Sequence, residues 1–256
     1  MKIQFIGTGS GKTTLKRFHS SILISSSDYN LLVDCGDGIS RALLSNNIDP
    51  NSIDGILITH FHPDHYSGLA ALLVQMKLTD RSERLEIFTH HSNIDYMHNF
   101  IYQSYIFIER LGFDLLQIPL ADDRSLKIKS SFKILTRQNS HLDHYRSFDI
   151  KNTLGFSCSS ILFEDESNTV FYTGDIGNKE DLYLFGTFKI NIMISEISHV
   201  DIKDIFEAFK SQKIKKLYLT HISDDDEPVL KDLLALLDNE ERKIINIAYD
   251  GLALHL

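Results

Sequence analysis

Residues 55–65 read Gly-Ile-Leu-Ile-Thr-His-Phe-His-Pro-Asp-His, and no other stretch of the chain constrains the protein so strongly. Its apolar first half is short and rich in β-branched residues, which predicts a buried strand. The polar second half places four candidate ligands in a loop just past that strand: His60, His62, Asp64 and His65. Open α/β sheets usually have their binding and active sites at this position. Imidazole and carboxylate groups suit zinc and similar divalent ions. The alternation lets His60 and His62 face one ion while Asp64 and His65 turn toward a second. A histidine-rich surface loop is the alternative, and this ligand spacing makes it the weaker one.

The composition is that of a globular protein with an ordinary core. Of the 256 residues, 43% are hydrophobic and 24% are charged, enough to bury a sizeable core. The net charge of -9 argues against broad, nonspecific nucleic-acid binding, because the phosphate backbone would be repelled. The two cysteines, Cys35 and Cys158, predict neither a disulfide framework nor a C-x-x-C metal site. We see no signal peptide and no apolar run of ~20 residues, and therefore expect no membrane association and a cytoplasmic location.

Strands and helices alternate along the chain in two similar passes. The first pass predicts strands at 2–7, 20–25, 30–34, 55–58 and 85–89, and helices at 38–46, 66–77 and 94–112. The second predicts strands at 126–136, 153–164, 168–173, 190–195, 215–220, 243–249 and 252–255, and helices at 201–209 and 227–239. Only four prolines occur, and no low-complexity linker interrupts the pattern. This favours a single domain over residues 1–256, built from two halves.

Three further candidate ligands follow predicted strands. Asp175 comes after Val-Phe-Tyr-Thr-Gly, and the small neighbour Gly174 would let the backbone approach a metal pair closely. His221 follows Leu-Tyr-Leu-Thr much as His60 follows Leu-Ile-Thr. The third candidate is His141 or His144. Each alone is more often a surface or capping residue, but three of them at successive strand ends favour a metal site.

Taken together, these motifs resemble the metallo-β-lactamase superfamily, whose signature is H-x-H-x-D-H followed by a histidine, an aspartate and a final histidine. The resemblance implies an α/β (α+β) fold, a four-layer αββα sandwich of two mixed β-sheets flanked by helices. It also implies two divalent metal ions, with zinc first and manganese or iron as alternatives. The implied ligands are His60, His62 and His141 for one ion, Asp64, His65 and His221 for the other, and Asp175 between both.

Two details of this resemblance concern single residues. Asp34 matches the family's early aspartate, which supports the metal loop rather than binding metal. We prefer His141 over His144 as the third histidine because it comes first after the strand predicted before it, and His144 stays open as the alternative.

Within the superfamily, the chain is most similar to the phosphodiesterase branch that includes ribonuclease Z. Its opening Gly7–Gly9 and the basic loop at 12–17 are similar to that branch, although the loop lacks the proline and asparagine of ribonuclease Z. Leu219–Ser223 resembles the motif L-T-H-hydrophobic-S. Glu196 sits where ribonuclease Z has H-E-A-T, whose histidine is replaced here by Ser195. We find no long glycine- and proline-rich insertion of the kind that grips transfer RNA.

The resemblance implies a dinuclear metal-dependent hydrolase that uses a metal-bridging hydroxide. Asp64 is implied as the catalytic carboxylate that orients the nucleophile or accepts its proton. We expect a phosphodiester substrate, either a small molecule or a nucleic acid, and hydrolysis of a thioester, lactone, sulfate ester or β-lactam is the alternative. His199, or whichever of His141 and His144 is not a ligand, is a candidate general acid. A homodimer is an open alternative to a monomer.

Overall fold

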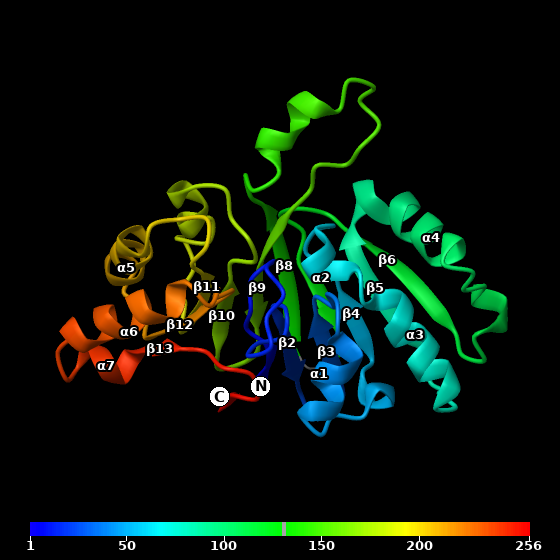
Figure 1. The fold of residues 1–256 in the computed structure, drawn as a ribbon, viewed down its shortest axis with the longest axis horizontal. Helices are drawn as coiled ribbons and strands as arrows, with labels where there is room; N and C mark the ends of the chain where they lie inside the picture. The colour runs from blue at the N-terminus through cyan, green and yellow to red at the C-terminus, as the bar shows by residue number, and fades with distance from the viewer. Residues whose placement is uncertain (130–131) are drawn as a thin grey trace.

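Two β-sheets lie face to face in the computed structural model, which describes residues 1–129 and 132–256, and helices cover the outer side of each sheet (Figure 1). Within the described residues each sheet has seven strands. The first sheet contains, in spatial order, β14 (Ala253–His255), β1 (Lys2–Gly7), β2 (Ser21–Ser25), β3 (Asn30–Val33), β4 (Gly55–Leu57), β5 (Leu85–His90) and β6 (Leu115–Leu120). The second contains β13 (Ile245–Ile247), β12 (Lys216–Thr220), β11 (Ile192–Glu196), β10 (Thr169–Tyr172), β9 (Ser159–Glu164), β8 (Phe132–Gln138) and β7 (Leu126–Ile128).

The two sheets share one pattern of strand directions. In the first, β14, β1, β2 and β3 pair antiparallel, and β3, β4, β5 and β6 pair parallel. In the second, β7 to β10 pair antiparallel, and β10 to β13 pair parallel. Both sheets are therefore mixed. The two passes seen in the sequence correspond to them, except that the last strand of the second pass, β14, pairs with β1 of the first sheet.

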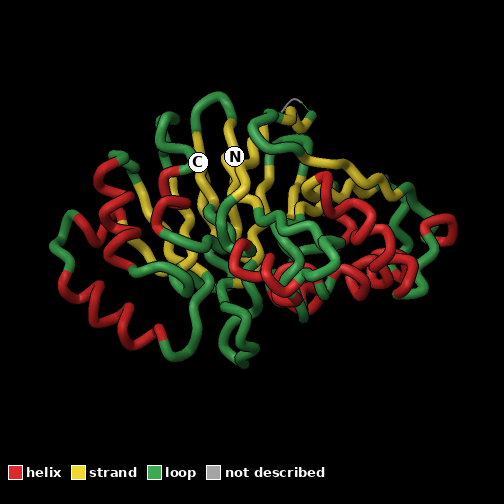
Figure 2. The backbone as a smooth tube through the Cα atoms, turned by 90° about the horizontal axis from the view of Figure 1, so that it is seen from above, coloured by secondary structure: helices red, strands yellow, loops and turns green. Residues whose placement is uncertain are grey.

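Helices complete the outer layers on both sides. They are α1 (Ile39–Ser45), α2 (Pro63–Tyr66), α3 (Leu69–Leu78), α4 (Ile94–Gln103), α5 (Ile202–Ser211), α6 (Asp226–Leu236) and α7 (Glu241–Ile244). Helices α1, α3 and α4 cover the first sheet, and α5, α6 and α7 lie beside the second; Figure 2 shows the strands from above between these two groups. The predicted four-layer αββα sandwich is confirmed. Among the described helices, none has the length and apolar character needed to span a lipid bilayer.

Three apolar layers hold the sandwich together. The inner layer, between the sheets, contains fully buried rings such as Phe5 and Phe163. The two outer layers pack each sheet against its helices. Strand β4 is buried along its whole length, as expected for a parallel strand covered on both faces. This places the loop after β4 at a rigid edge of the sandwich.

The first half departs from the predicted elements in three places. The helix predicted at 94–112 ends at Gln103, because Tyr105 takes a left-handed conformation (φ 56) that stops an α-helix. Strand β6 was not predicted. It contains Pro119, which is tolerated because β6 is an edge strand. The helix predicted at 66–77 is divided into α2 and α3, and the backbone at Gly68 packs so closely that a Cβ there would lie 2.1 Å from the Gly36 carbonyl oxygen.

Two predictions in the second half also differ from the structure. The stretch 126–136, predicted as one strand, forms the antiparallel pair β7 and β8, and its residues 130 and 131 lie outside the described residues. The strand predicted at 153–164 begins only at Ser159. Residues 139–158, between β8 and β9, instead form a projection that we call the arm; it rises beyond the strand ends at the top of Figure 1.

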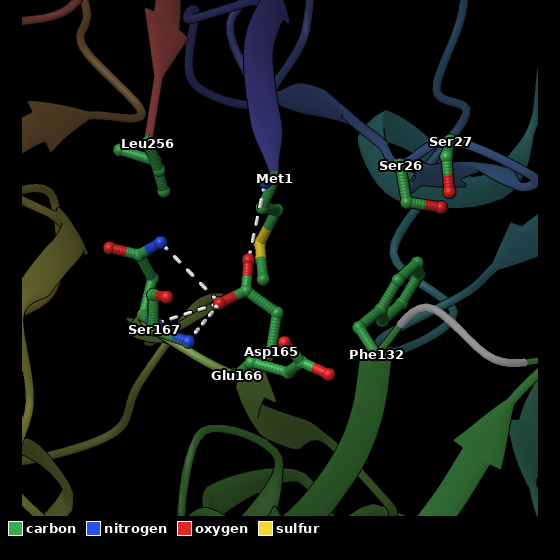
Figure 3. A pocket seen from close by; sticks show the side chains of 9 residues that line it. Met1, Ser26, Ser27, Phe132, Asp165, Glu166, Ser167 and Leu256 are labelled. Atoms are coloured by element: carbon green, nitrogen blue, oxygen red, sulfur yellow. Dashed lines mark hydrogen bonds and ion pairs between the residues drawn. The ribbon is translucent and has the colours of Figure 1, made fainter.

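The chain ends lie together at the opposite end of the sandwich from the arm (Figure 1). The Leu256 amide donates a hydrogen bond to the Met1 carbonyl at 3.0 Å. Next to them is a pocket of about 590 Å³ that contains none of the candidate ligands (Figure 3). Its lining comprises Met1, Ser26, Ser27, Phe132, Asp165, Glu166, Ser167, Asn168 and Leu256.

The basic loop after β1 is fastened to the C-terminal half of the chain. The Arg17 guanidinium donates hydrogen bonds to Glu227 (3.0 Å), to the Thr8 hydroxyl (2.6 Å) and to the Ala248 carbonyl (2.9 Å). Lys12 and Lys16 pair with the acidic run after His221, at Asp225 and Asp224 respectively. The positive charges of this loop are thus balanced within the chain.

Replacing Arg17 with alanine is expected to lower the free energy of unfolding by about 1.5–3 kcal/mol, the usual contribution of hydrogen bonds to a charged group. The side chain is only 11% exposed, so its partners would lose bonds that water does not readily replace. Urea denaturation would measure the effect. Lys16→Ala is the matched control, because its side chain is 60% exposed and an exposed ion pair contributes at most ~1 kcal/mol. Equal losses in the two variants would contradict the anchoring role.

Candidate metal centre

The predicted ligands meet at one edge of the sandwich and come from both sheets. His60 to His65 follow β4 of the first sheet, whereas His141, Asp175 and His221 follow β8, β10 and β12 of the second. Their ligand atoms form two groups, each with all atoms within 4.8 Å of one another. Group 1 contains His60, His62, His141 and Asp175, and group 2 contains Asp64, His65, Asp175 and His221.

Asp175 belongs to both groups. Its Oδ2 atom lies 3.3 Å from His65 Nε2 and 3.4 Å from His221 Nε2 in group 2. The same oxygen lies 3.9 Å from His60 Nε2 and 3.8 Å from His141 Nε2 in group 1. One carboxylate oxygen therefore faces four imidazoles drawn from both groups.

Two imidazoles of group 1 lie close together. His62 Nδ1 lies 3.1 Å from His141 Nε2. In group 2, Asp64 Oδ2 lies 3.4 Å from both His65 Nε2 and His221 Nε2. His65 and His221 are buried, whereas Asp64 and His62 are half-buried, so the open side of the centre is at these two residues.

The donor atoms fit divalent ions. His60 Nε2 and His65 Nε2 are buried and have no hydrogen-bond partner among the described residues, which is costly unless something else binds them. The Nδ1 atom of three of the candidate ligand histidines is held by a neighbouring side chain. His60 Nδ1 contacts the Thr59 hydroxyl at 3.1 Å, His65 Nδ1 contacts Asp34 at 2.8 Å, and His221 Nδ1 contacts the Ser198 hydroxyl at 3.0 Å. Held in this way, all three Nε2 atoms point into the centre.

Three turns at strand ends rely on left-handed backbone conformations. Asp34 after β3 has φ 62, Gly174 after β10 has φ 58, and His221 after β12 has φ 57. Such conformations are uncommon for residues other than glycine. At His221 the strained turn is also fixed by the Ser198 hydroxyl, which donates to the His221 carbonyl at 2.8 Å.

Asp34 supports the loop after β4, as the family resemblance implied. It is fully buried, and its carboxylate accepts the Thr59 amide at 2.8 Å and the Thr59 hydroxyl at 2.9–3.0 Å. The same carboxylate accepts the His65 Nδ1 proton. Asp34 thus orients one histidine directly and a second, His60, through Thr59.

Asp34→Ala is expected to weaken metal binding by ~10–100-fold, the usual cost of losing a partner behind a metal ligand. The amide of Thr59 and the Nδ1 of His65 would lose their acceptor, and alanine would be strained at this positive φ. Asp34→Asn should lose less, because asparagine tolerates the left-handed region and keeps an acceptor oxygen. Chelator competition would give the dissociation constants; an alanine variant as tight as the unchanged protein would exclude this role.

The histidines of the two groups differ in the direction of their pKa shifts. Burial lowers the pKa of His60 and His62, and brings that of His141 to about 4, so these imidazoles are neutral near pH 7 and ready to bind metal. Burial also opposes charge on His65 and His221, but the neighbouring carboxylates together outweigh it and raise the pKa of both. These are Asp175 and Asp34 for His65, and Asp175 and Asp64 for His221. An ion entering group 2 must therefore displace protons, and its binding should weaken as pH falls.

The structure separates His141 from His144. His141 is buried within group 1. His144 is exposed on the arm, and its ring centroid lies 6.4 Å from that of His141. Asn139 fixes this arrangement, since its side-chain amide donates to the Asp175 carbonyl at 2.9 Å and its side-chain oxygen accepts the His141 amide at 3.1 Å.

Sequence reasoning missed Asn139 and Ser198, and treated His199 only as one candidate acid. Glu196, His199 and His221 form a third cluster within 4.8 Å. His199 Nδ1 lies 3.3 Å from the buried Glu196 carboxylate, and its ring centroid is 4.6 Å from that of His141. The only available signal was proximity in sequence to the Glu196 motif.

Comparison with known proteins agrees with this geometry. A family model described as Anti-Pycsar protein Apyc1 matches residues 1–233. Ribonuclease Z of Pyrococcus furiosus is 27% identical over 86% of both chains, and that of Archaeoglobus fulgidus is 24% identical over 93% of this chain and 94% of the relative. The metallo-β-lactamase fold protein YhfI from Bacillus subtilis superposes with a TM-score of 0.74 at 21% identity, covering 99% of this chain and 98% of YhfI. The short form of human tRNase Z superposes with a TM-score of 0.72 at 18% identity, over 100% and 99% of the two chains. The expected superfamily and its ribonuclease Z-like branch are confirmed.

Proposed function

Since the chain belongs to the Anti-Pycsar protein Apyc1 family, and its curated relatives include ribonuclease Z, we propose that it hydrolyses phosphodiester bonds. It is a dinuclear metal-dependent hydrolase, with zinc as the first choice of metal and manganese or iron as alternatives. The observation that carries the proposal is the single Asp175 carboxylate shared by two complete ligand groups.

We assign His60, His62 and His141 to one ion, Asp64, His65 and His221 to the other, and Asp175 to both. When bound, the two ions activate a water molecule and neutralise charge that develops on the phosphate oxygens. Asp64 is half-buried at the open side of the centre. From there its carboxylate orients the attacking water, while the buried histidines keep their donor atoms fixed.

His199 is suited to protonate the leaving group. Its side chain is 36% exposed, next to His141 and His221 but in neither ligand group that includes Asp175. The hydrogen bond to Glu196 raises the pKa of His199, although burial opposes this. A protonated imidazole is therefore available at the edge of the centre over a wider pH range than an unpaired histidine would give.

We expect a small or single-stranded phosphodiester as substrate. The net charge of -9 disfavours long duplexes. In addition, the basic side chains of the loop at 12–17 are already paired with carboxylates of the same chain, which leaves little free positive charge there for a polyanion.

A substrate panel tests the proposal. Purified protein loaded with zinc or manganese would be assayed on bis-p-nitrophenyl phosphate, a dinucleotide, a lactone, a thioester, a sulfate ester and nitrocefin. We expect turnover of the phosphodiesters, lost on chelation and restored by metal. Ready cleavage of a lactone or thioester, with every phosphodiester untouched, would replace this function by the alternative one.

A further inference from the structure

The arm places an aromatic side chain against group 1. Tyr145 lies in the 3-10 helix η4 (Asp143–Phe148), four residues after His141. Its ring centroid is 5.5 Å from that of His62, with the two ring planes nearly perpendicular (85°). His62 lies on the open side of the centre, so Tyr145 stands at the edge of the space that a substrate must enter.

This tyrosine is not explained by packing. Its side chain is 39% exposed, and its hydroxyl makes no hydrogen bond to any described residue. A large ring with an exposed face and an unused hydroxyl contributes little to the core. Exposed rings beside a phosphate-binding centre are typical of surfaces on which nucleobases stack.

The ring is held in place by its neighbours on the arm. The His144 ring lies against it with a centroid separation of 3.9 Å and a tilt of 39°. Arg146 donates to Asp143 at 2.8 Å, and its guanidinium lies over the Phe156 ring at 5.3 Å. These contacts tie the two sides of the arm together around Tyr145.

The base of the arm is fixed to the first sheet. The Ser157 and Ser92 hydroxyls are 2.9 Å apart. Gly155 approaches so closely that a Cβ there would lie 2.4 Å from the side-chain oxygen of Asn93. Because Ser92 and Asn93 directly follow β5, the position of Tyr145 relative to His62 is set by both sheets.

We propose that Tyr145, backed by His144, is the surface on which an aromatic group of the substrate stacks, and that this group is a nucleobase. The inference rests on the proposed function and adds to it the side chain that contacts the substrate beyond its phosphate. Stacking accepts the face of any base, so it favours nucleotide over alkyl phosphodiesters without choosing among bases.

Two esters with the same leaving group test this. The p-nitrophenyl ester of thymidine 5'-phosphate and methyl p-nitrophenyl phosphate differ only in the group that stays on the phosphate. The unchanged protein should have the higher kcat/KM on the thymidine ester. Tyr145→Ala and Tyr145→Leu should reduce the ratio of the two kcat/KM values by about 5- to 100-fold, the range for losing one base-stacking ring.

Matched variants separate stacking from other roles. Tyr145→Phe keeps the ring and should keep the ratio. Phe148→Ala also lies on the arm but is 78% exposed, and it should leave the ratio unchanged. The metal content of each variant would be measured, so that a loss of ions is not mistaken for a loss of stacking; such a loss affects both esters and cancels in the ratio.

An unchanged ratio in Tyr145→Ala and Tyr145→Leu would overturn the inference, as would equal kcat/KM values on the two esters in the unchanged protein. If Tyr145→Phe lowered the ratio as much as Tyr145→Ala, the inference would also be overturned, because the preference for the thymidine ester would then depend on the hydroxyl and not on the ring. If the unchanged, metal-loaded protein cleaved neither ester nor any other phosphodiester, the proposed function itself would fail and the inference with it.

Discussion

Asp175→Ala is expected to lose both ions together and with them essentially all hydrolysis. Even the loss of a group behind a metal ligand costs ~10–100-fold, and Asp175 faces four candidate ligand imidazoles itself. Without its negative charge, the pKa values of His65 and His221 would also fall, because this carboxylate contributes most among the groups that raise them against burial. Elemental analysis would report the metal per chain, and the rate on bis-p-nitrophenyl phosphate the activity.

The control for this variant is Asp232→Ala, which removes an exposed carboxylate from α6. It should retain metal, activity and the thermal unfolding midpoint. Asp175→Ala with a full complement of metal would show that the shared carboxylate is not a bridge. Loss of one ion alone would assign Asp175 to a single group.

His199→Ala is expected to slow cleavage of a dinucleotide by about 100-fold or more, the usual contribution of a positioned general acid. A sugar alkoxide leaves poorly without a proton, whereas p-nitrophenolate leaves unaided, so bis-p-nitrophenyl phosphate should be affected much less. Because Glu196 raises the pKa of His199, the donor is protonated below that pKa and lost as pH rises through it. The unchanged protein should therefore show a falling rate at high pH on the dinucleotide, and the variant should lack that fall.

Two comparisons keep this assignment testable. Metal content of His199→Ala would be measured, since the ring lies near His141 and His221. His255→Ala, at an exposed position in β14, should behave as the unchanged protein. Equal losses on both substrates would make His199 a structural neighbour of the centre rather than the proton donor.

Most strands and helices could be predicted because their patterns are local, whereas the four-layer arrangement was implied by the family resemblance. Strand β4 is a short apolar run buried on both faces, and the H-x-H-x-D-H loop follows it directly. Departures arose where one residue overrides a pattern. The apolar periodicity predicted a helix beyond Gln103, but the left-handed Tyr105 ends it. The edge strand β6 was not predicted, and it contains Pro119, which is unusual in strands.

The ligand groups could be predicted only as sets of residue types at strand ends. Whether His141 or His144 enters group 1 depends on Asn139 and on the path of the arm, neither of which leaves a periodic signal. The same holds for Tyr145, which looks like an ordinary loop residue until the arm is folded beside His62. Contacts between segments far apart in sequence decide these details.

The division of the ligands between the two sheets has a consequence for the newly made chain. Asp64 and His221 are separated by 157 positions; Asp64 follows β4 of the first sheet and His221 follows β12 of the second. Neither sheet alone offers a full set of donors for group 2. During translation the growing polypeptide therefore cannot assemble group 2 until β12 has emerged and paired with β11.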